Sequence, residues 1–257
     1  MNNLDLKEKY DEVFKEGSEN FFTCNVFHEA WTIVGMEDWK GKKVMDVGCG
    51  EGMLPAMIGH AGASSVLGID YSKEAIKNAN NKFNIPNVEF AVKDYRDINN
   101  TFDVITMQGV MEHLDNPWDE LENILENNLP HKSVSDGCLI TSSPSFLNPR
   151  GYVWMTLAKL FDVPMSLTDL HFISPFDMLD FCADRGYDLE YKSIHQDWGS
   201  GKTMIHDFNK RLRNALRDAD MDNSKVDDLL EWLDQARLYF DTNESSGAIV
   251  VYKVYKT

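Results

Sequence analysis

The sequence predicts an α/β protein with a doubly wound, mostly parallel sheet. Between residues 42 and 146, short runs rich in β-branched residues alternate with stretches of helical periodicity. This alternation is typical of parallel strands whose connecting helices cover both faces of a sheet. The chain has 257 residues, 43% of them hydrophobic, so it can bury one sizeable core. A helical stretch at 201–240 precedes a strongly β-forming run at 247–256, which places a helical insertion before the last strand.

Five strands and three helices are expected in the alternating region. The expected strands are 43–48, 65–70, 88–94, 102–109 and 137–145. The expected helices are 53–62, 72–83 and 116–129. Ser72 can cap the second of these helices, and Asn116, followed by Pro117 at the first helical position, can cap the third.

The pattern is less regular beyond this region. Residues 146–173 form a long connection rich in aromatic residues and methionine. A helix over 174–186 and a strand over 188–195 follow. The helical stretch 201–240 divides into two segments near residues 222–223.

Charge and composition exclude several classes of partner. The formal net charge of −17 repels a phosphate backbone at long range, and acidic residues directly follow the basic cluster at 210–217, so nucleic acid is not expected. No stretch has the apolar length of a membrane span, and the polar first residues do not resemble a signal peptide. We therefore expect a cytoplasmic protein. The four cysteines are far apart and predict buried free thiols.

The run VMDVGCGEG places glycines at every second position directly after the first strand. Gly48, Gly50 and Gly52 follow Asp46. A strand, a glycine-rich turn and a helix N-terminus together bind nucleotides, because the turn offers free N–H groups. Dinucleotide-binding loops have the spacing G-x-G-x-x-G, and an acid two residues before the first glycine suits a cofactor that carries positive charge.

This run resembles the first motif of the class I S-adenosylmethionine-dependent methyltransferases. The resemblance continues in order through GIDYS (68–72), VKDYRD (92–97) and FDVITMQGVMEHL (102–114), and it covers roughly residues 40–195. It implies a Rossmann-like sheet of seven strands in which 248–255 lies antiparallel beside the fifth strand. It also implies S-adenosyl-L-methionine as the cofactor and S-adenosyl-L-homocysteine as the product.

The resemblance also implies roles for individual residues. Asp70 would accept hydrogen bonds from the ribose hydroxyls, Asp94 would meet the adenine amino group, and Tyr95 would flank the adenine ring. The implied cofactor-binding set is Asp46, Gly48, Cys49, Gly50, Asp70, Tyr71, Asp94, Tyr95 and Gln108. Each of the three acids could instead cap the element that follows its strand.

Methyl transfer requires alignment of the reactants, and a hydroxyl nucleophile also needs a base. His113 and His171 are the catalytic candidates, with a structural role in a turn or loop as the alternative for each. Methyltransferases of the ubiquinone-biosynthesis O-methyltransferase type carry a similar Glu-His pair at the position of His113. In some of them a further glutamate helps to hold a metal ion, but this chain has Gly109 there, so we expect no metal site.

O-methylation of a small-molecule hydroxyl is the leading hypothesis. N-methylation of an amine or a peptide side chain needs no strong base and is the first alternative. A non-catalytic S-adenosylmethionine-binding protein and a dinucleotide-dependent oxidoreductase are the others.

The connection at 146–173 supplies the candidate acceptor-binding residues, because it leaves the carboxyl end of a strand. They are Arg150, Tyr152, Trp154 and Met155. Arg150 could meet an acidic group of the acceptor, and the others could form an apolar wall. A satellite core beneath the connection would need the same residues.

Three parts of the chain are expected. Residues 1–40 form a helical cap, residues 41–200 and 245–257 form the methyltransferase domain, and residues 201–244 form a helical insertion. We expect the insertion to be a helical hairpin near the mouth of the cavity. It could serve as a lid, as an acceptor-recognition module or as the interface of a homodimer.

Overall fold

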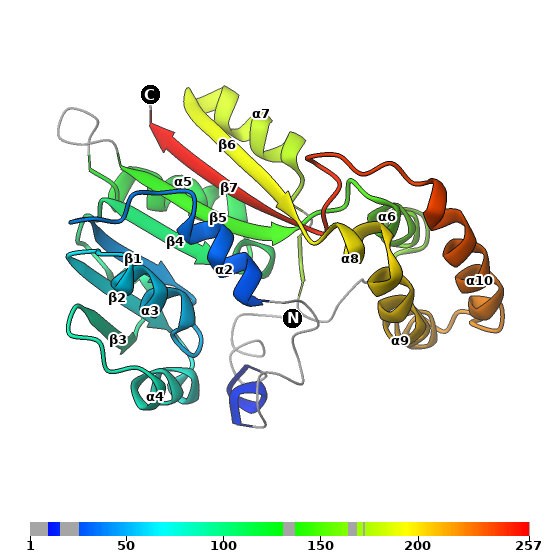
Figure 1. The fold of residues 1–257 in the computed structure, drawn as a ribbon, viewed down its shortest axis with the longest axis horizontal. Coiled ribbons are helices and arrows are strands. Elements are labelled where there is room, and N and C mark those ends of the chain that lie inside the picture. Colours follow the sequence, from blue (N-terminus) through cyan, green and yellow to red (C-terminus); the bar gives the residue numbers. More distant parts are fainter. Residues whose placement is uncertain (1–9, 16–25, 131–136, 164–168, 172, 257) are drawn as a thin grey trace.

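The computed structural model describes residues 10–15, 26–130, 137–163, 169–171 and 173–256. Its strands are β1 (Lys43–Val47), β2 (Ser65–Asp70), β3 (Val88–Val92), β4 (Val104–Gln108), β5 (Cys138–Pro144), β6 (Tyr187–Ile194) and β7 (Ile249–Lys256). They form a seven-stranded sheet in the order β3-β2-β1-β4-β5-β7-β6 (Figure 1). Strands β1 to β5 pair in parallel, and β7 pairs antiparallel with both β5 and β6. The predicted fold class is confirmed, including the antiparallel last strand beside the fifth.

The helices are α2 (Val26–Val34), α3 (Met53–His60), α4 (Lys73–Lys82), α5 (Pro117–Asn127), α6 (Pro149–Phe161), α7 (Pro175–Arg185), α8 (Gln196–Ser200), α9 (Lys202–Asp218) and α10 (Val226–Ala236). Short 3₁₀ turns are η2 (Tyr95–Asp97), η3 (Met111–His113) and η4 (Arg237–Tyr239). Residues 10–15 are also helical, and we call them the N-terminal helix. The remaining residues of the expected cap, 1–9 and 16–25, lie outside the described part of the chain.

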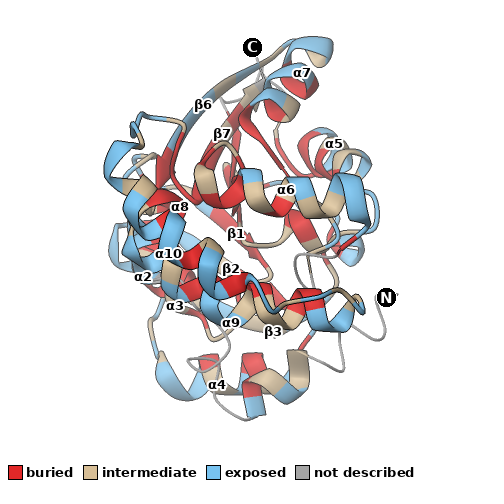
Figure 2. Cartoon of the chain, turned by 90° about the vertical axis from the view of Figure 1, so that its right-hand side faces the viewer, coloured by how far each residue is buried: buried red, intermediate tan, exposed pale blue. Residues whose placement is uncertain are grey.

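The strands are largely buried (Figure 2), and a hydrophobic core lies on each face of the sheet. On one face, α2 and α3 pack against the strands through residues such as Ile33 and Ile58. On the other face, α5 and α7 do so through residues such as Leu121 and Phe181. Because successive residues of a strand point to opposite faces, Val44 of β1 belongs to the first core and Met45 to the second. Both faces are buried, as expected for a parallel sheet.

The connection after β5 contains a helix that the sequence interpretation missed. Helix α6 begins after Asn148, whose side chain accepts a hydrogen bond from Gly151 N at 2.8 Å, and Pro149 is its first residue. These are ordinary start signals. The helix was nevertheless missed, because the apolar residues of α6 lie on all of its sides and do not form the single stripe that marks an amphipathic helix.

A third, smaller core joins α6 to the helical hairpin formed by α9 and α10. Trp154 of α6, Phe208 of α9 and Leu230 of α10 belong to it. The hairpin itself was predicted, and the structure shows that its apolar face packs on α6. The four helices α6, α8, α9 and α10 gather beyond the carboxyl end of β5 and the start of β7 (Figure 1).

Candidate active site at the carboxyl ends of the strands

The strand order reverses between β1 and β4, so the loops after these two strands diverge and leave a crevice. The glycine loop after β1 occupies one side of it. Gly48 and Gly50 have φ values of 69° and 51°, a left-handed conformation that favours glycine. A Cβ at Gly48 would lie 2.7 Å from the side chain of Val110, whereas a Cβ at Gly50 would lie 3.6 Å from the ring of Phe14. Gly48 is thus required by the protein's own packing, and at Gly50 the loop faces the N-terminal helix.

Asp70 ties the glycine loop to the end of β2. Its Oδ2 accepts a hydrogen bond from Gly50 N at 3.0 Å, and its Oδ1 accepts one from Ser72 N at 2.8 Å. The side chain is buried, and burial, together with the charge of Asp11, raises its pKa. The backbone of Tyr71 also hydrogen-bonds to this carboxyl. A carboxylate has about four acceptor positions, so Asp70 keeps acceptor capacity toward a ligand.

Asp46 lies one layer deeper, within β1. Its Oδ1 accepts a hydrogen bond from Thr106 Oγ1 at 2.6 Å. Burial and the nearby charge of Asp70 raise the pKa of Asp46 to about 7. A bound cation would favour the ionised form of this carboxyl.

The remaining residues of the cofactor-binding set lie around this pair. Cys49 is buried beneath the loop, and burial raises the pKa of its thiol, which stays protonated. Tyr71 is 37% exposed at the end of β2. Gln108 lies at the end of β4. Its side chain and that of Ser142 both hydrogen-bond to the buried carboxyl of Glu29. Glu29, which the sequence interpretation did not single out, connects α2 to the ends of β4 and β5.

Asp94 and Tyr95 follow β3, at the sheet's far side. Asp94 accepts hydrogen bonds from Arg96 N at 3.0 Å, Nε at 2.9 Å and Nη2 at 2.6 Å. It therefore caps η2, which is the structural role that the sequence left open. Tyr95 is buried in the core that includes Phe102 and Leu121.

The turn after β4 carries the Glu-His pair. The Glu112 carboxyl is buried and its Oε2 accepts a hydrogen bond from Ser143 Oγ at 3.0 Å. Burial raises its pKa to about 7, against the opposing effect of His113. The backbone oxygen of Glu112 accepts from Leu170 N at 2.7 Å and from His171 N at 3.2 Å. These bonds dock the segment 169–171 onto η3.

The two histidines differ in what their rings contact. Nε2 of His113 lies 3.0 Å from the Tyr10 hydroxyl, and Nδ1 lies 3.8 Å from Asp169 Oδ1. Nε2 of His171 lies 3.2 Å from the backbone oxygen of Asp115, which can only accept, so His171 donates there. This leaves Nδ1 as the ring nitrogen of His171 that can accept, whereas Nε2 of His113 already contacts a hydroxyl group. Neither Tyr10 nor Asp169 was singled out from the sequence, because both are brought to His113 by the tertiary fold.

The four candidate acceptor residues occupy different environments. Arg150 is 1% exposed, its Nε donates to Asp207 Oδ2 at 3.0 Å, and its guanidinium lies 4.5 Å from the ring centre of Trp198. Trp154 is fully buried against Phe208. These contacts favour the satellite core that the sequence left as an alternative. Tyr152 is 60% exposed.

Among the described residues, Nη1 of Arg150 and Nε1 of Trp154 are buried without a hydrogen-bond partner. Met155 is partly buried and packs against the same core.

Comparisons with known proteins identify the family. A family model described as a methyltransferase domain matches residues 44–128. The ubiquinone biosynthesis O-methyltransferase of Glaesserella parasuis is 31% identical over 219 residues, which cover 76% of this chain and 88% of that protein. The enzyme of the same name from Neisseria meningitidis is 30% identical over 168 residues, covering 61% of this chain and 68% of that protein. The chain belongs to the class I S-adenosylmethionine-dependent methyltransferases.

A solved structure agrees with this methyltransferase fold. The magnesium protoporphyrin IX methyltransferase of Synechocystis, determined with bound S-adenosylhomocysteine, has a TM-score of 0.54 and 15% identity, and covers 100% of this chain and 89% of that chain. Because the chain belongs to this family, it is an enzyme that uses S-adenosylmethionine, and the oxidoreductase and non-catalytic alternatives are set aside.

The site suits this cofactor chemically. S-adenosylmethionine carries a sulfonium and an ammonium group, and the buried carboxyls of Asp46 and Asp70 lie beside the glycine loop. The charges that act on these two carboxyls in the structure are those of other acids, among them Asp11. A cation bound here would offset this repulsion from neighbouring acids.

The described part of the chain contains no group of three or more histidine, cysteine, aspartate or glutamate residues arranged to hold a metal ion. Gly109, the position that the sequence analysis compared with a metal-binding glutamate, has a φ of 64°. No helix in the described ranges is long and apolar enough to cross a membrane.

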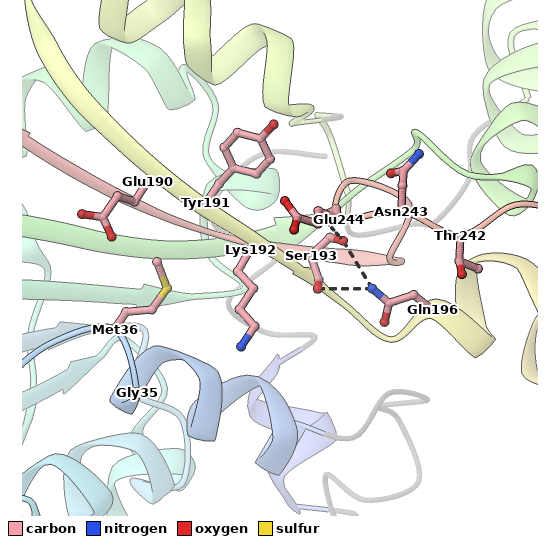
Figure 3. Close-up of a pocket in the computed structure, with 10 residues that line it drawn as sticks. All are labelled: Gly35, Met36, Glu190, Tyr191, Lys192, Ser193, Gln196, Thr242, Asn243 and Glu244. Carbon is pink, nitrogen blue, oxygen red and sulfur yellow. Dashed lines mark hydrogen bonds between the residues drawn. The ribbon is translucent and has the colours of Figure 1, made fainter.

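An open cavity of about 800 Å³ lies elsewhere on the molecule. Figure 3 shows Lys192 and Gln196 among its lining residues, between the edge strand β6 and the end of α2. Strands β4, β5 and β7 separate β6 from β1. This cavity is therefore distinct from the crevice at the glycine loop.

Proposed function

We propose that this methyltransferase methylates a hydroxyl group of a small molecule, with His113 as the general base. The observation that carries the proposal is the pair of contacts that the His113 ring makes. The Asp169 carboxylate lies near Nδ1, and a hydroxyl group, that of Tyr10, lies at Nε2. A carboxylate near Nδ1 favours the tautomer whose proton is on Nδ1, which leaves Nε2 able to accept. The relatives named O-methyltransferases support the same reaction type.

The cofactor supplies an activated methyl group whose transfer needs no further activation. Asp70 is proposed to accept hydrogen bonds from the ribose hydroxyls through the free lone pairs of its two oxygens. Asp46 and the loop residues Gly48 to Gly50, with Gln108 opposite, are proposed to hold the cationic methionine end. Tyr71 is proposed to cover the adenosine.

Asp94 is proposed to accept a hydrogen bond from the adenine amino group through Oδ2. This oxygen already accepts one hydrogen bond, from Arg96 Nη2. It is a weaker partner than Asp70, because its carboxylate is 38% exposed and shared with Arg96. Tyr95 is proposed to support the adenine site from below, since its ring lies in the core.

The acceptor hydroxyl then gives its proton to Nε2 of His113 while its oxygen is methylated. Asp169 stabilises the imidazolium that forms. Tyr152 and Met155 are proposed to border the acceptor.

Replacement of His113 by alanine tests the proposal. Turnover of a hydroxylated acceptor should fall about 10²- to 10⁴-fold, while calorimetric affinity for S-adenosylhomocysteine should change less than about threefold. His60→Ala, at the far end of α3, is the matched control. Equal turnover in His113→Ala and wild type, or methylation of amines in a mixed acceptor screen with no methylation of hydroxyls, would refute the base role or the O-methylation.

The partners of the enzyme and its location in the cell are also proposed. The net charge of −17 disfavours nucleic acid as a partner, and a cytoplasmic location is proposed. Trp232, Leu238 and Tyr239 are exposed on α10 and η4, so a homodimer through this surface is included in the proposal. Sedimentation analysis of wild type and Trp232→Glu would test it.

A further inference from the structure

Glu29 connects helix α2 to the ends of two central strands. Its side chain is 4% exposed. Gln108 of β4 and Ser142 of β5, which lie opposite each other in the sheet, both hydrogen-bond to its carboxyl. Helix α2 contacts β5 and β7, and its residues Ala30 and Ile33 belong to the core on this face. The carboxyl is therefore fixed beside the crevice by a helix that packs on the sheet.

The strand register places Gln108 opposite the start of the glycine loop. Asp46 of β1 pairs in parallel with Thr106 of β4. Gln108 follows two residues beyond Thr106, at the level where β1 ends and the glycine loop begins. Because side chains alternate along a strand, Gln108 points to the same face as Val104, which belongs to the core beneath α2. Gln108 and the carboxyls of Asp46 and Glu29 therefore lie on one face of the sheet, beside the glycine loop.

The Glu29 carboxyl has polar partners but no cationic partner in the described part of the chain. No lysine, arginine or histidine of the described ranges forms an ion pair with it. Burial raises its pKa, and the hydrogen bonds from Ser142 and Gln108 oppose this effect. The ammonium group of the cofactor's methionine end would bring positive charge to this side of the crevice, which favours the ionised carboxyl.

An ionised carboxyl can only accept hydrogen bonds, so the Gln108 amide meets it with its NH₂ group, and the amide carbonyl oxygen points away from Glu29. We propose that Glu29 is a positioning residue of the cofactor site, which fixes the Gln108 amide so that its carbonyl oxygen accepts a hydrogen bond from the cofactor's ammonium group. With the amide reversed, two donors would face each other. The inference rests on the proposed function, which places Gln108 at the methionine end of the cofactor.

Calorimetry of the full chain with two ligands tests the inference. S-adenosylhomocysteine carries the ammonium group, whereas methylthioadenosine lacks the whole amino-acid portion. In Glu29→Leu, affinity for S-adenosylhomocysteine should fall about tenfold, as for one hydrogen bond to a charged group, and affinity for methylthioadenosine should change less than about twofold. Glu29→Gln keeps the size and can still accept from the Gln108 amide, so it should fold normally and lose only about threefold for S-adenosylhomocysteine. Glu37→Leu, which removes a carboxylate paired with Lys253, is the control and should leave both affinities unchanged.

A double-mutant cycle measures whether Glu29 acts through Gln108. Gln108→Leu should weaken S-adenosylhomocysteine binding by a similar factor, and adding Glu29→Leu should weaken it less than about twofold further. Additive losses, equal losses for the two ligands, or unchanged S-adenosylhomocysteine affinity in both Glu29 variants would overturn the inference. Unchanged affinity in Gln108→Leu would overturn it too, and only this result would also contradict the proposed role of Gln108. The measurements need no turnover, so they do not depend on whether His113 is the base.

Discussion

The two halves of the crevice are built in different ways. On the cofactor side, the glycine loop and Asp70 are 20 residues apart in sequence, and backbone N–H groups of Gly50 and Ser72 hold the carboxylate. On the acceptor side, His113 contacts Tyr10, which is 103 residues away. Arg150 likewise contacts Asp207, which is 57 residues away. The cofactor side is thus set by local backbone geometry, and the acceptor side by side chains that only the tertiary fold brings together.

This difference has a consequence for stability. Local backbone bonds form whenever the βαβ unit forms, so Asp70 and the glycine loop are joined by contacts within one such unit. The Arg150–Asp207 pair, by contrast, is fully buried between α6 and α9, and a buried charge that loses its partner is costly. We therefore expect loss of this buried pair to affect mainly folding, and loss of Asp70 to affect mainly cofactor binding.

The largest expected effect is on the acceptor side. Arg150→Met leaves the Asp207 carboxylate buried beside Arg211 alone, 3.8 Å away, and should lower the free energy of unfolding by about 3 kcal/mol. Urea unfolding measures it. Arg217→Ala, which breaks an exposed ion pair with Asp218, is the control and should cost less than about 1 kcal/mol.

Affinity for S-adenosylhomocysteine should remain within about threefold in the folded fraction of Arg150→Met. A large loss of cofactor affinity with unchanged stability would show that the two sides are not separate in the way described.

The second effect is on the cofactor side. Asp70→Ala should weaken S-adenosylhomocysteine binding at least about tenfold, because a buried ribose would lose two hydrogen bonds to a charged acceptor. Asp94→Ala should weaken it only about twofold to fivefold, since that carboxylate is partly exposed and shared with Arg96. Calorimetry compares the two. Equal losses of affinity in the two variants would mean that Asp94 contributes as much to cofactor binding as Asp70.

The same division explains how much could be predicted from the sequence. The fold, the glycine loop and Asp70 follow from short patterns, because strand ends and turns are encoded by neighbouring residues. Helix α6 was missed because its apolar residues lie on all sides. Tyr10 and Asp169 were missed because neither belongs to a local motif. Asp94 carried a family role and a capping role at once, and the structure shows the cap.

The third effect is a pH dependence of cofactor binding. Asp46 has a pKa of about 7 in the free protein, so it is mostly neutral below that pH and ionised above it. A bound cation favours the ionised form, so binding releases a proton and affinity for S-adenosylmethionine should rise severalfold between pH 6 and pH 8. Asp46→Asn should remove much of this rise.

Calorimetry in two buffers with different ionisation enthalpies measures the released proton directly. Glu112, which has a pKa of about 7 for the same physical reason, provides the comparison, because it lies at the acceptor side. If Glu112→Gln removes the pH dependence and Asp46→Asn does not, the cation is recognised by the acceptor side.

The smallest effect compares two helix starts that looked alike in the sequence. Ser72 Oγ accepts a hydrogen bond from Ala75 N at 3.2 Å and donates to the Asp11 carboxylate, whereas the Asn116 side chain makes no cap bond at the start of α5. Ser72→Ala should therefore lower the free energy of unfolding by about 1 kcal/mol, and Asn116→Ala should change it by less than about 0.5 kcal/mol. Ser72→Ala should also loosen the N-terminal helix, so proteolysis between residues 10 and 15 should become faster than in Asn116→Ala. Equal stability losses in the two variants, with equal cleavage, would mean that Ser72 does not link the cofactor side to the N-terminal helix.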